Sequence, residues 1–505
     1  MRTSALALAL VAAWCAVAES NGRPPATSTI TFQEGDPQHI VAGMTFGALF
    51  STDGGQTWTW ICEATFPYSG MYDPVFAYTQ TGAVFATTFS GLKVMRDGCS
   101  FSLSPVAGRR CGGPTGQPCF SDVYISNVLE GSGSAIYATA SSPYNSLIYK
   151  SSDDGQTFSE LSSPGLPDDY WQSFVIAPSD PSRVYLAGYR FTKECDDNSS
   201  NEGSACNLNA NCTASGSAMA KCTTVKVFLL MRSDDGGKTF APLSQANVTL
   251  SQSSAIYVVG VDPTDANAVY LHVSFETGSG GDGVYKSMNG GGSGSADPTA
   301  WTKILDTNDP NGLVMLVRSN GGLVAGTIMS GAQSSPGGSA CVDQTSCNWT
   351  ALPNAPHINC LAEEPDNKDV WACTQNYGNG STITSDGAGI MKTADLATWT
   401  PVLDYSDINA PVTCGSDTAQ AQQCVAPYEG MPSVWCCLVN QLGITTTAID
   451  CTGAYACLMG ADDPAGSNTE QTTKSGCCNT GEGGAGALLL GVVTGLFLYR
   501  RRRYA

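Results

Sequence analysis

The apolar residues of this chain fall in short runs that are separated by turn residues. Runs such as IYAT at residues 136–139 and VYLA at residues 184–187 recur along the sequence, and seven of them begin at residues 40, 84, 136, 184, 269, 323 and 370. Each of these seven runs is preceded by a similar run and followed by another, which ends in a glycine-containing turn. A fourth run begins after that turn. Such runs predict β-strands, so each unit predicts four short strands.

A turn motif of the form S-x-D-x-G-x-T-[WF] follows the third strand of a unit. Three full copies, called boxes below, occupy residues 51–58, 151–158 and 233–240. The carboxylate can accept backbone N–H groups across a tight turn, and the glycine supplies a positive φ. The box aspartates are therefore predicted to be structural: Asp53, Asp153 and Asp235. The aromatic residues that end the boxes are predicted to be buried: Trp58, Phe158 and Phe240.

The spacing of the turns predicts the architecture. With weaker copies at residues 94, 287, 342 and 393, seven turns lie 43 to 57 residues apart, except for one interval of 82. That interval contains a cysteine-rich insertion, residues 192–224, without which it would be 49 residues. Seven units of four strands predict an all-β fold, a seven-bladed β-propeller over residues 27–403. A β-solenoid is the alternative, but it would require a shorter and more uniform period.

The boxes resemble those of the Asp-box, or BNR, propellers, a group that includes sialidases, xyloglucanase-type glycosidases, sortilin-type receptors and a photosystem assembly factor. The resemblance implies that the boxes lie on turns of the outer strands, away from the functional face. It does not decide between enzymes and binding proteins, since both carry the box. Sialidase activity is disfavoured, because the F-R-I-P start of that family is missing and few arginines remain for a carboxylate site.

Composition and charge narrow the possible partners. The net charge of -20 argues against nucleic acid and against an anionic membrane surface. Of the 21 cysteines, 20 lie outside the predicted leader described below, which indicates a disulfide framework in an exported protein. Zinc is disfavoured because no C-x-x-C pair occurs and only 3 histidines are present. A single carboxylate per box offers too few ligands for calcium, so neither metal nor cofactor is expected.

Two disulfide arrangements are predicted. Cys360 and Cys373 lie on adjacent strands, placed symmetrically about the turn near Asp366 and Asn367, in a unit counted as the sixth blade. Cβ atoms opposite one another across such strands are about 4.5 to 5.5 Å apart, near the reach of a disulfide. The cysteines of the insertion are expected to pair among themselves: Cys195, Cys206, Cys212 and Cys222.

The two ends of the chain predict its destination. Residues 1–18 carry Arg2, an apolar run and an A-x-A pattern, which together predict a secretory signal peptide. After the propeller, residues 404–459 predict a cysteine-rich module stapled by disulfides, and residues 460–484 a flexible stalk. Residues 485–505 combine a short apolar run with an arginine cluster.

This tail resembles the sorting signal of myxobacterial surface proteins. The parts that carry the resemblance are Cys477 and Cys478, a small-residue spacer, the apolar run and four arginines: Arg500, Arg501, Arg502 and Arg503. The resemblance implies cleavage by an intramembrane sorting protease and attachment through a cysteine. It predicts a bacterial cell-surface or outer-membrane protein delivered by a membrane-inserted tail. A plain C-terminal membrane anchor is the alternative.

Candidate chemistry lies in the loops that connect the outer strand of one blade to the innermost strand of the next. In a propeller these loops surround a funnel on the functional face, and here they carry acids and aromatic residues, including Tyr170, Trp171, Asp306 and His357. The candidates for a glycosidase acid pair are Asp73, Asp122, Asp168 and Asp169. The favoured hypothesis is a surface-displayed module that binds glycan or protein ligands at the funnel. The alternatives are a secreted glycosidase-like hydrolase and a structural spacer of the envelope.

Overall fold

The computed structural model describes residues 24–451 with internal gaps. The gaps are residues 67–72, 108–119, 121–123, 132, 142–145, 197–202, 208–210, 213–220, 275–281, 293–296, 308–311, 330, 379–382, 428–431, 446–448 and 450. The predicted signal peptide, stalk and sorting tail therefore lie outside the described residues.

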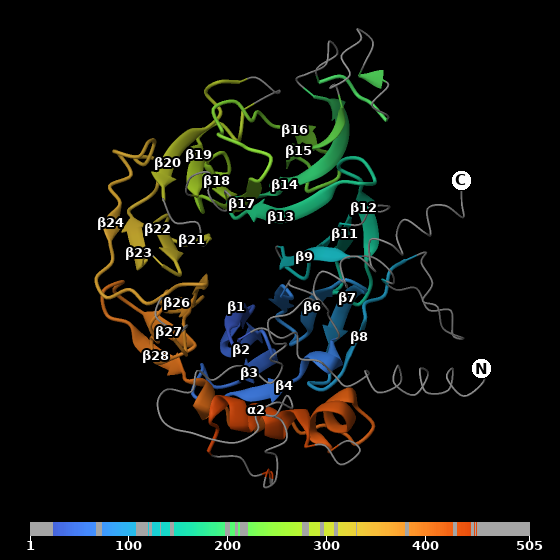
Figure 1. The fold of residues 1–505 in the computed structure, drawn as a ribbon, viewed down its shortest axis with the longest axis vertical. Helices are drawn as coiled ribbons and strands as arrows, with labels where there is room; N and C mark the ends of the chain where they lie inside the picture. The colour runs from blue at the N-terminus through green and yellow to red at the C-terminus, as the bar shows by residue number, and fades with distance from the viewer. Residues whose placement is uncertain are drawn as a thin grey trace, which may run out of the picture.

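The strands form seven small sheets arranged as blades around a ring (Figure 1). The first four blades consist of β1 (Thr27–Gln33), β2 (Asp36–Met44), β3 (Gly47–Ser51) and β4 (Thr59–Ile61); β5 (Phe76–Tyr78), β6 (Val84–Thr88), β7 (Gly91–Met95) and β8 (Phe101–Leu103); β9 (Ile125–Glu130), β10 (Ile136–Ala140), β11 (Leu147–Ser151) and β12 (Ser159–Ser162); and β13 (Tyr170–Ala177), β14 (Asp180–Cys195), β15 (Cys222–Ser233) and β16 (Ala241–Pro242). Within each blade, consecutive strands pair antiparallel.

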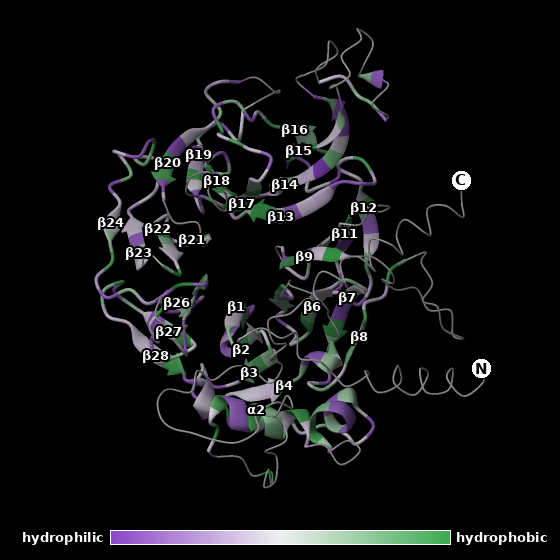
Figure 2. Cartoon of the chain, viewed as in Figure 1, coloured by the Kyte–Doolittle hydropathy of each residue, from purple (hydrophilic) through white to green (hydrophobic). Residues whose placement is uncertain are grey.

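The remaining three blades complete the ring. They consist of β17 (Ala255–Val261), β18 (Val269–Ser274), β19 (Gly283–Ser287) and β20 (Thr302–Asp306); β21 (Leu313–Val317), β22 (Leu323–Thr327), β23 (Gly331–Ser335) and β24 (Thr350–Ala351); and β25 (Cys360–Glu363), β26 (Val370–Cys373), β27 (Ile390–Thr393) and β28 (Thr400–Leu403). The seven-bladed all-β propeller predicted from the sequence is confirmed. Each of the seven recurring runs lies in the second strand of a blade. Apolar residues are prominent in strands such as β6 and β17 (Figure 2).

Aromatic and cationic side chains repeat at one register position of the blades. An aromatic residue on the second strand faces a basic residue on the third strand, directly before the turn. The ammonium group lies 4.8 to 5.2 Å from the ring centroid in three such pairs: Lys150 over Tyr137, Lys286 over Tyr270 and Lys392 over Trp371. A cation over an aromatic face is attracted by the ring quadrupole, so each pair ties two strands of its blade together.

The burial of the box aromatics agrees with the prediction at two of three positions. Trp58 is 2% exposed and Phe158 is 0% exposed, but Phe240 is only partly buried. Phe240 precedes β16, which has just two residues and pairs with only two residues of β15. A ring at such a short outer strand has less of the neighbouring blade to cover it.

Some disulfides lie within a single blade, and others join the blades to the segment that follows the propeller. Cys360 pairs with Cys373, as predicted, although the pair lies in the seventh blade and not in the sixth. The insertion cysteines pair among themselves, as Cys195–Cys212 and Cys206–Cys222. The other described disulfides are Cys62–Cys424, Cys99–Cys414, Cys341–Cys347 and Cys436–Cys451. Disulfides of this number are typical of exported proteins.

Residues 404–451, called the strap below, follow the last blade and contain three described helical segments, while η1 (Glu63–Thr65) lies in blade 1. These segments are η3 (Tyr405–Asp407), the π-helix η4 (Gln420–Val425) and α2 (Val434–Leu442). The short strand β29 (Ala410–Pro411) pairs parallel with β4 as a fifth strand of blade 1. In Figure 1, α2 runs along the outside of β4. Among the described residues, no helix has the length and apolar character needed to cross a membrane.

Candidate functional site

The antiparallel order of the strands gives the ring two different faces. The first strand of every blade begins on one side, here called the upper face, which also receives the turns between second and third strands. The opposite side, the box face, carries the turns between first and second strands together with the boxes. Backbone hydrogen bonds join the two kinds of turn there, from Gly54 to Gln38 (2.9 Å) and from Asp154 to Ser134 (3.1 Å).

Each box aspartate is engaged within its own turn. Oδ1 of Asp235 accepts the N–H groups of Lys238 (3.0 Å) and Thr239 (2.9 Å), and Oδ2 accepts the Thr239 hydroxyl (2.6 Å). The Thr239 hydroxyl and then its N–H stabilise the charged form, which lowers the pKa of Asp235 to about 2. Asp53 and Asp153 accept the same two bonds from Thr57 and Thr157.

The candidate acidic residues of the funnel do not share one environment. Asp73 is partly buried at the connection between blades 1 and 2, whereas Asp122 lies outside the described residues. Asp168 is exposed, while the next residue, Asp169, is 0% exposed. Among the other loop residues, Asp306 lies 3.3 Å from the ammonium group of Lys303.

Asp169 is held by a fixed set of partners. Its Oδ2 accepts the N–H of Leu166 (2.8 Å) and a bond from Nη2 of Arg190 (3.1 Å). Nε of Arg190 lies 2.9 Å from Oδ1 without hydrogen-bond geometry, so this contact is electrostatic. Burial raises the pKa of Asp169, while the Leu166 N–H and the Arg190 charge act in the opposite direction. The carboxylate therefore anchors the connection between blades 3 and 4.

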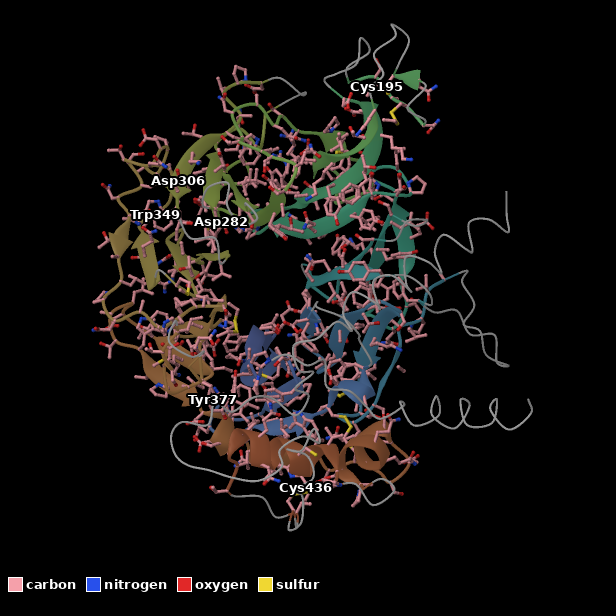
Figure 3. All side chains as sticks on the ribbon, viewed as in Figure 1. Cys195, Asp282, Asp306, Trp349, Tyr377 and Cys436 are labelled. Atoms are coloured by element: carbon pink, nitrogen blue, oxygen red, sulfur yellow. A yellow bond between two sulfur atoms is a disulfide. The ribbon has the colours of Figure 1, made fainter. Side chains whose placement is uncertain are left out.

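All three histidines lie beside an aspartate. His39 pairs with Asp36 (2.9 Å) on the box face, and His357 pairs with Asp386 (2.9 Å) on the upper face. The third pair is buried: Nε2 of His272, 8% exposed, lies 3.1 Å from Oδ2 of Asp282, 0% exposed. In Figure 3, Asp282 lies nearer to the centre of the ring than Asp306.

The buried pair belongs to a polar chain that links three blades. Oδ2 of Asp282 also accepts the N–H of Leu313 (2.9 Å), at the start of blade 6. The His272 ring stacks on Tyr257 with centroids 5.8 Å apart, and the Tyr257 hydroxyl accepts a bond from Gln172 of blade 4 (3.1 Å). This chain of polar contacts was not predicted from the sequence, where its one signal is an imidazole in an otherwise apolar strand.

A cluster of aromatic residues, the blade-4 cluster, lies where β14 and β15 extend beyond the ring. These strands stay paired from Val184–Ser233 to Cys195–Cys222, far longer than in the other blades. Tyr170 and Tyr189 stack with centroids 5.2 Å apart and planes 9° apart, and Phe191 meets Tyr189 edge-on at 5.3 Å. Phe191 is 50% exposed. Only Tyr170 of these residues was among the predicted funnel residues.

Exposed large apolar side chains are more numerous on the upper face than on the box face. Six large hydrophobic residues are exposed in the described part of the chain. Four of them lie on second-to-third-strand turns or interblade loops of the upper face, or on the extension there: Phe89, Leu166, Phe191 and Met329. Met288 and Val342 lie on the box face. Contiguous exposed apolar surface is typical of interaction sites, and of these four residues Phe191 belongs to such a group, the blade-4 cluster.

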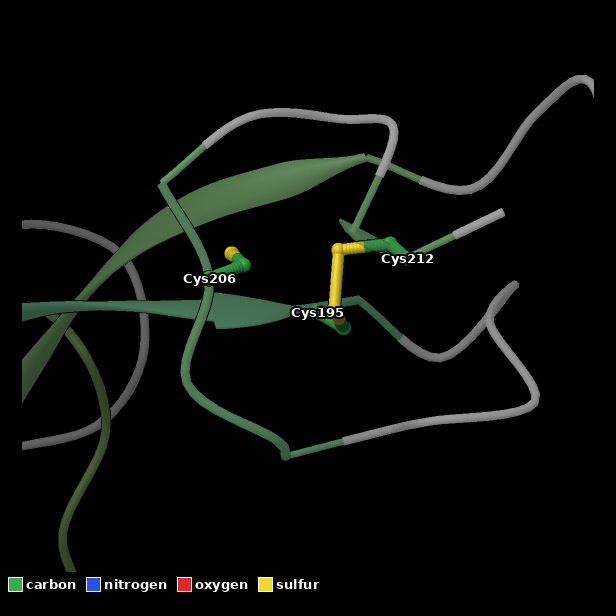
Figure 4. A group of neighbouring side chains, drawn as sticks. All are labelled: Cys195, Cys206 and Cys212. Atoms are coloured by element: carbon green, nitrogen blue, oxygen red, sulfur yellow. A yellow bond between two sulfur atoms is a disulfide. The ribbon is translucent and has the colours of Figure 1, made fainter. Parts of the chain in front are cut away.

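The sulfur atoms of Cys195, Cys206 and Cys212 lie within 4.8 Å of one another at the end of this extension. Such a group has the composition of a metal site. However, Cys195 is bonded to Cys212 (Figure 4), and Cys206 is bonded to Cys222. Disulfide sulfurs are not thiolate ligands, so the group in this state is a covalent staple for the hairpin.

Comparison with known proteins gives similarity to solved structures alone. No family model and no curated protein matches the chain. YCF48 from Cyanidioschyzon merolae is 11% identical over 70% of this chain and 94% of its own, with a TM-score of 0.41. The extracellular domain of the putative one component system BT4673 from B. thetaiotaomicron is 12% identical over 69% of this chain, with a TM-score of 0.40. This chain covers 37% of that one.

A third similar structure is PorZ, described as an essential surface component of the type-IX secretion system of Porphyromonas gingivalis. It is 12% identical over 72% of this chain and 46% of its own, with a TM-score of 0.41. The assignment of this chain as a β-propeller rests on its own strand pairing.

Proposed function

We propose that this protein is an exported recognition module that binds a glycan or protein ligand on its upper face and carries out no catalysis. The observation that carries the proposal is the blade-4 cluster, whose exposed Phe191 is one of four large exposed apolar side chains on that face. Aromatic rings provide large contact areas with little loss of conformational entropy, for sugar rings and for protein side chains alike.

The surroundings of the cluster add polar groups to the apolar surface. The ammonium group of Lys226 lies 5.0 Å from the Tyr189 ring centroid and donates to the carbonyl oxygen of Ser254 (2.7 Å). The cluster is thus braced against the loop that leads into blade 5. A braced aromatic surface binds with less ordering cost than a loose one.

The positions of the acidic candidates favour binding over hydrolysis. Glycosidases use two carboxyl groups facing one another across about 5 to 10 Å of open cleft. Asp168 and Asp169 are consecutive, and Asp169 is engaged by Arg190 and Leu166. The hydrolase alternative would have to draw its pair from Asp73, Asp122 and the exposed Asp168. Release of reducing sugars that is lost in an Asp73→Asn variant would support it.

The proposed location is the bacterial cell surface. The described disulfides support export, and residues 1–18 would act as the signal peptide. The tail would be processed by a sorting protease, with Cys477 or Cys478 as the attachment point and the arginine cluster removed. The box aspartates would serve the fold, as in the Asp-box propellers that their sequence resembles.

The test is a matched pair of substitutions on opposite faces. A glycan array and a binding screen against envelope proteins first provide a ligand for the intact protein. Phe191→Ser should then weaken binding at least about tenfold, equivalent to about 1.4 kcal/mol. Met288→Ser removes a similarly exposed apolar side chain (40%) from the box face and should leave affinity unchanged. Equal effects of the two substitutions would contradict a site on the upper face.

A further inference from the structure

The ring has a seam between its first and last blades. In the described chain, the four core strands of each blade are consecutive in sequence, and the strand that links the end of the propeller to blade 1 is β29 of the strap, which pairs with β4. Blade 1 meets blade 7 through side chains, with Phe32 of β1 edge-on to Trp371 of β26 at 5.3 Å. Side-chain packing alone would leave this seam no stronger than any other interblade contact.

The strap crosses the seam and binds the outer edge of blade 1. The N–H groups of Asn409 and Val412 donate to the carbonyl oxygens of Trp58 and Trp60 (both 2.9 Å). The Gln420 side chain, 0% exposed, accepts the N–H of Cys62 (3.0 Å) and donates to the Trp60 carbonyl oxygen (2.9 Å). A buried side-chain amide whose oxygen and nitrogen are both hydrogen-bonded indicates a specific docking position for the strap.

The strap also holds blade 7 and the beginning of β1. The Tyr405 hydroxyl lies 2.9 Å from Oγ1 of Thr27 at the beginning of β1. The Tyr377 hydroxyl, in blade 7, donates to the carbonyl oxygen of Leu442 at the end of α2 (2.9 Å). Figure 3 labels Tyr377, in blade 7, and Cys436, in α2 of the strap. The strap therefore touches both sides of the seam.

Two disulfides fix the strap to the first two blades, and they differ in exposure. Cys62–Cys424 spans 362 residues and is buried, since its cysteines are 2% and 0% exposed. Cys99–Cys414 spans 315 residues and is only partly buried. A disulfide that closes a long loop constrains the unfolded chain more than one that closes a short loop.

We propose that the strap is a two-lock, redox-sensitive clasp of the propeller ring. Cys99–Cys414 is the outer lock, which a dithiol in solution reaches first, and Cys62–Cys424 is the inner lock, which is shielded while the strap is seated. With both locks reduced, the strap leaves β4 and the seam between blades 1 and 7 opens, while the other interblade contacts remain closed. Each reduction transfers two electrons and two protons from the dithiol, which becomes a disulfide, and leaves two thiols.

The test measures amide hydrogen exchange strand by strand in the full-length exported protein. Three variants are compared: Cys99→Ser with Cys414→Ser, Cys62→Ser with Cys424→Ser, and all four together. In the fourfold variant, exchange in β1 and β25 should rise at least about tenfold, with β17 and β21 unchanged. Each twofold variant keeps one lock and should stay within about twofold of the parent. The control, Cys341→Ser with Cys347→Ser, removes a disulfide that spans 6 residues in blade 6 and should not affect the seam.

The proposal is overturned if the seam exchanges normally in the fourfold variant, or if exchange rises equally in β17 and β21. If the fourfold variant does not fold, a second measurement on the parent protein tests the proposal. The parent protein is titrated with dithiothreitol, free thiols are alkylated, and exchange is read in each labelled population. Opening should occur only where both locks are alkylated, and Cys99–Cys414 should be reduced before Cys62–Cys424. Opening with the inner lock intact would equally overturn the clasp.

Discussion

The substitution Asp169→Asn separates a structural carboxylate from a catalytic one. Asp169 is fully buried, and the Arg190 side chain is 22% exposed. An asparagine can still accept the Leu166 N–H, but it leaves the guanidinium without its counter-charge. Breaking a buried ion pair costs about 3 to 5 kcal/mol. Because Arg190 keeps some contact with water, we expect the lower end of that range, about 3 kcal/mol.

The assay is thermal unfolding by calorimetry in oxidising buffer. About 360 described residues give an unfolding entropy of about 0.75 kcal/mol/K, so 3 kcal/mol lowers Tm by about 4 °C. The control is Asp168→Asn, which changes an exposed neighbour and should shift Tm by less than about 1 °C. The double variant with Arg190→Gln should lose less than the sum of the single losses, since no charge then remains unpaired. A Tm unchanged by Asp169→Asn would refute the anchoring role, and loss of a hydrolytic activity at unchanged Tm would favour the enzyme.

Three further predictions follow from other parts of the molecule. Burial, then repulsion from Glu34 and Asp154, raises the pKa of Glu130 to about 8 from 4.5. Between those two pH values the folded state binds a proton that the unfolded state does not, so the stability of the parent protein falls as pH rises from about 4.5 to 8. The denaturation midpoint of Glu130→Gln should not show that fall. Gly165→Ala would place a Cβ against Oδ2 of Asp169, so the urea midpoint of unfolding should drop. An unchanged midpoint would contradict this close packing. Replacing Cys477 and Cys478 by Ser should leave uncut precursor in the inner membrane or release protein into the medium; recovery of Ala505 in mature surface protein would exclude sorting.

The repeat architecture could be predicted from the sequence because it depends on local patterns. Strand-length runs, the turn glycines and the spacing of the boxes are encoded within each unit, and seven similar units can only bury their faces against one another. The pairing of Cys360 with Cys373 followed for the same reason, since register across a single turn is a local property. The cation–aromatic pairs, such as Lys150 over Tyr137, were equally readable from this register, although they were not predicted.

The contacts that join distant segments were decided by the tertiary structure alone. Nothing near Asp169 in the sequence indicates that Arg190 pairs with it. Likewise nothing near His272 indicates that its partner is Asp282, 10 positions further along the chain. The seat of the strap depends on Cys62 and Cys424, 362 residues apart, meeting once the ring has closed. The burial of Phe240 likewise depends on how far β16 extends. Local periodicity specifies the blades, but closure of the ring brings together side chains whose separation along the chain carries no information about their distance in space.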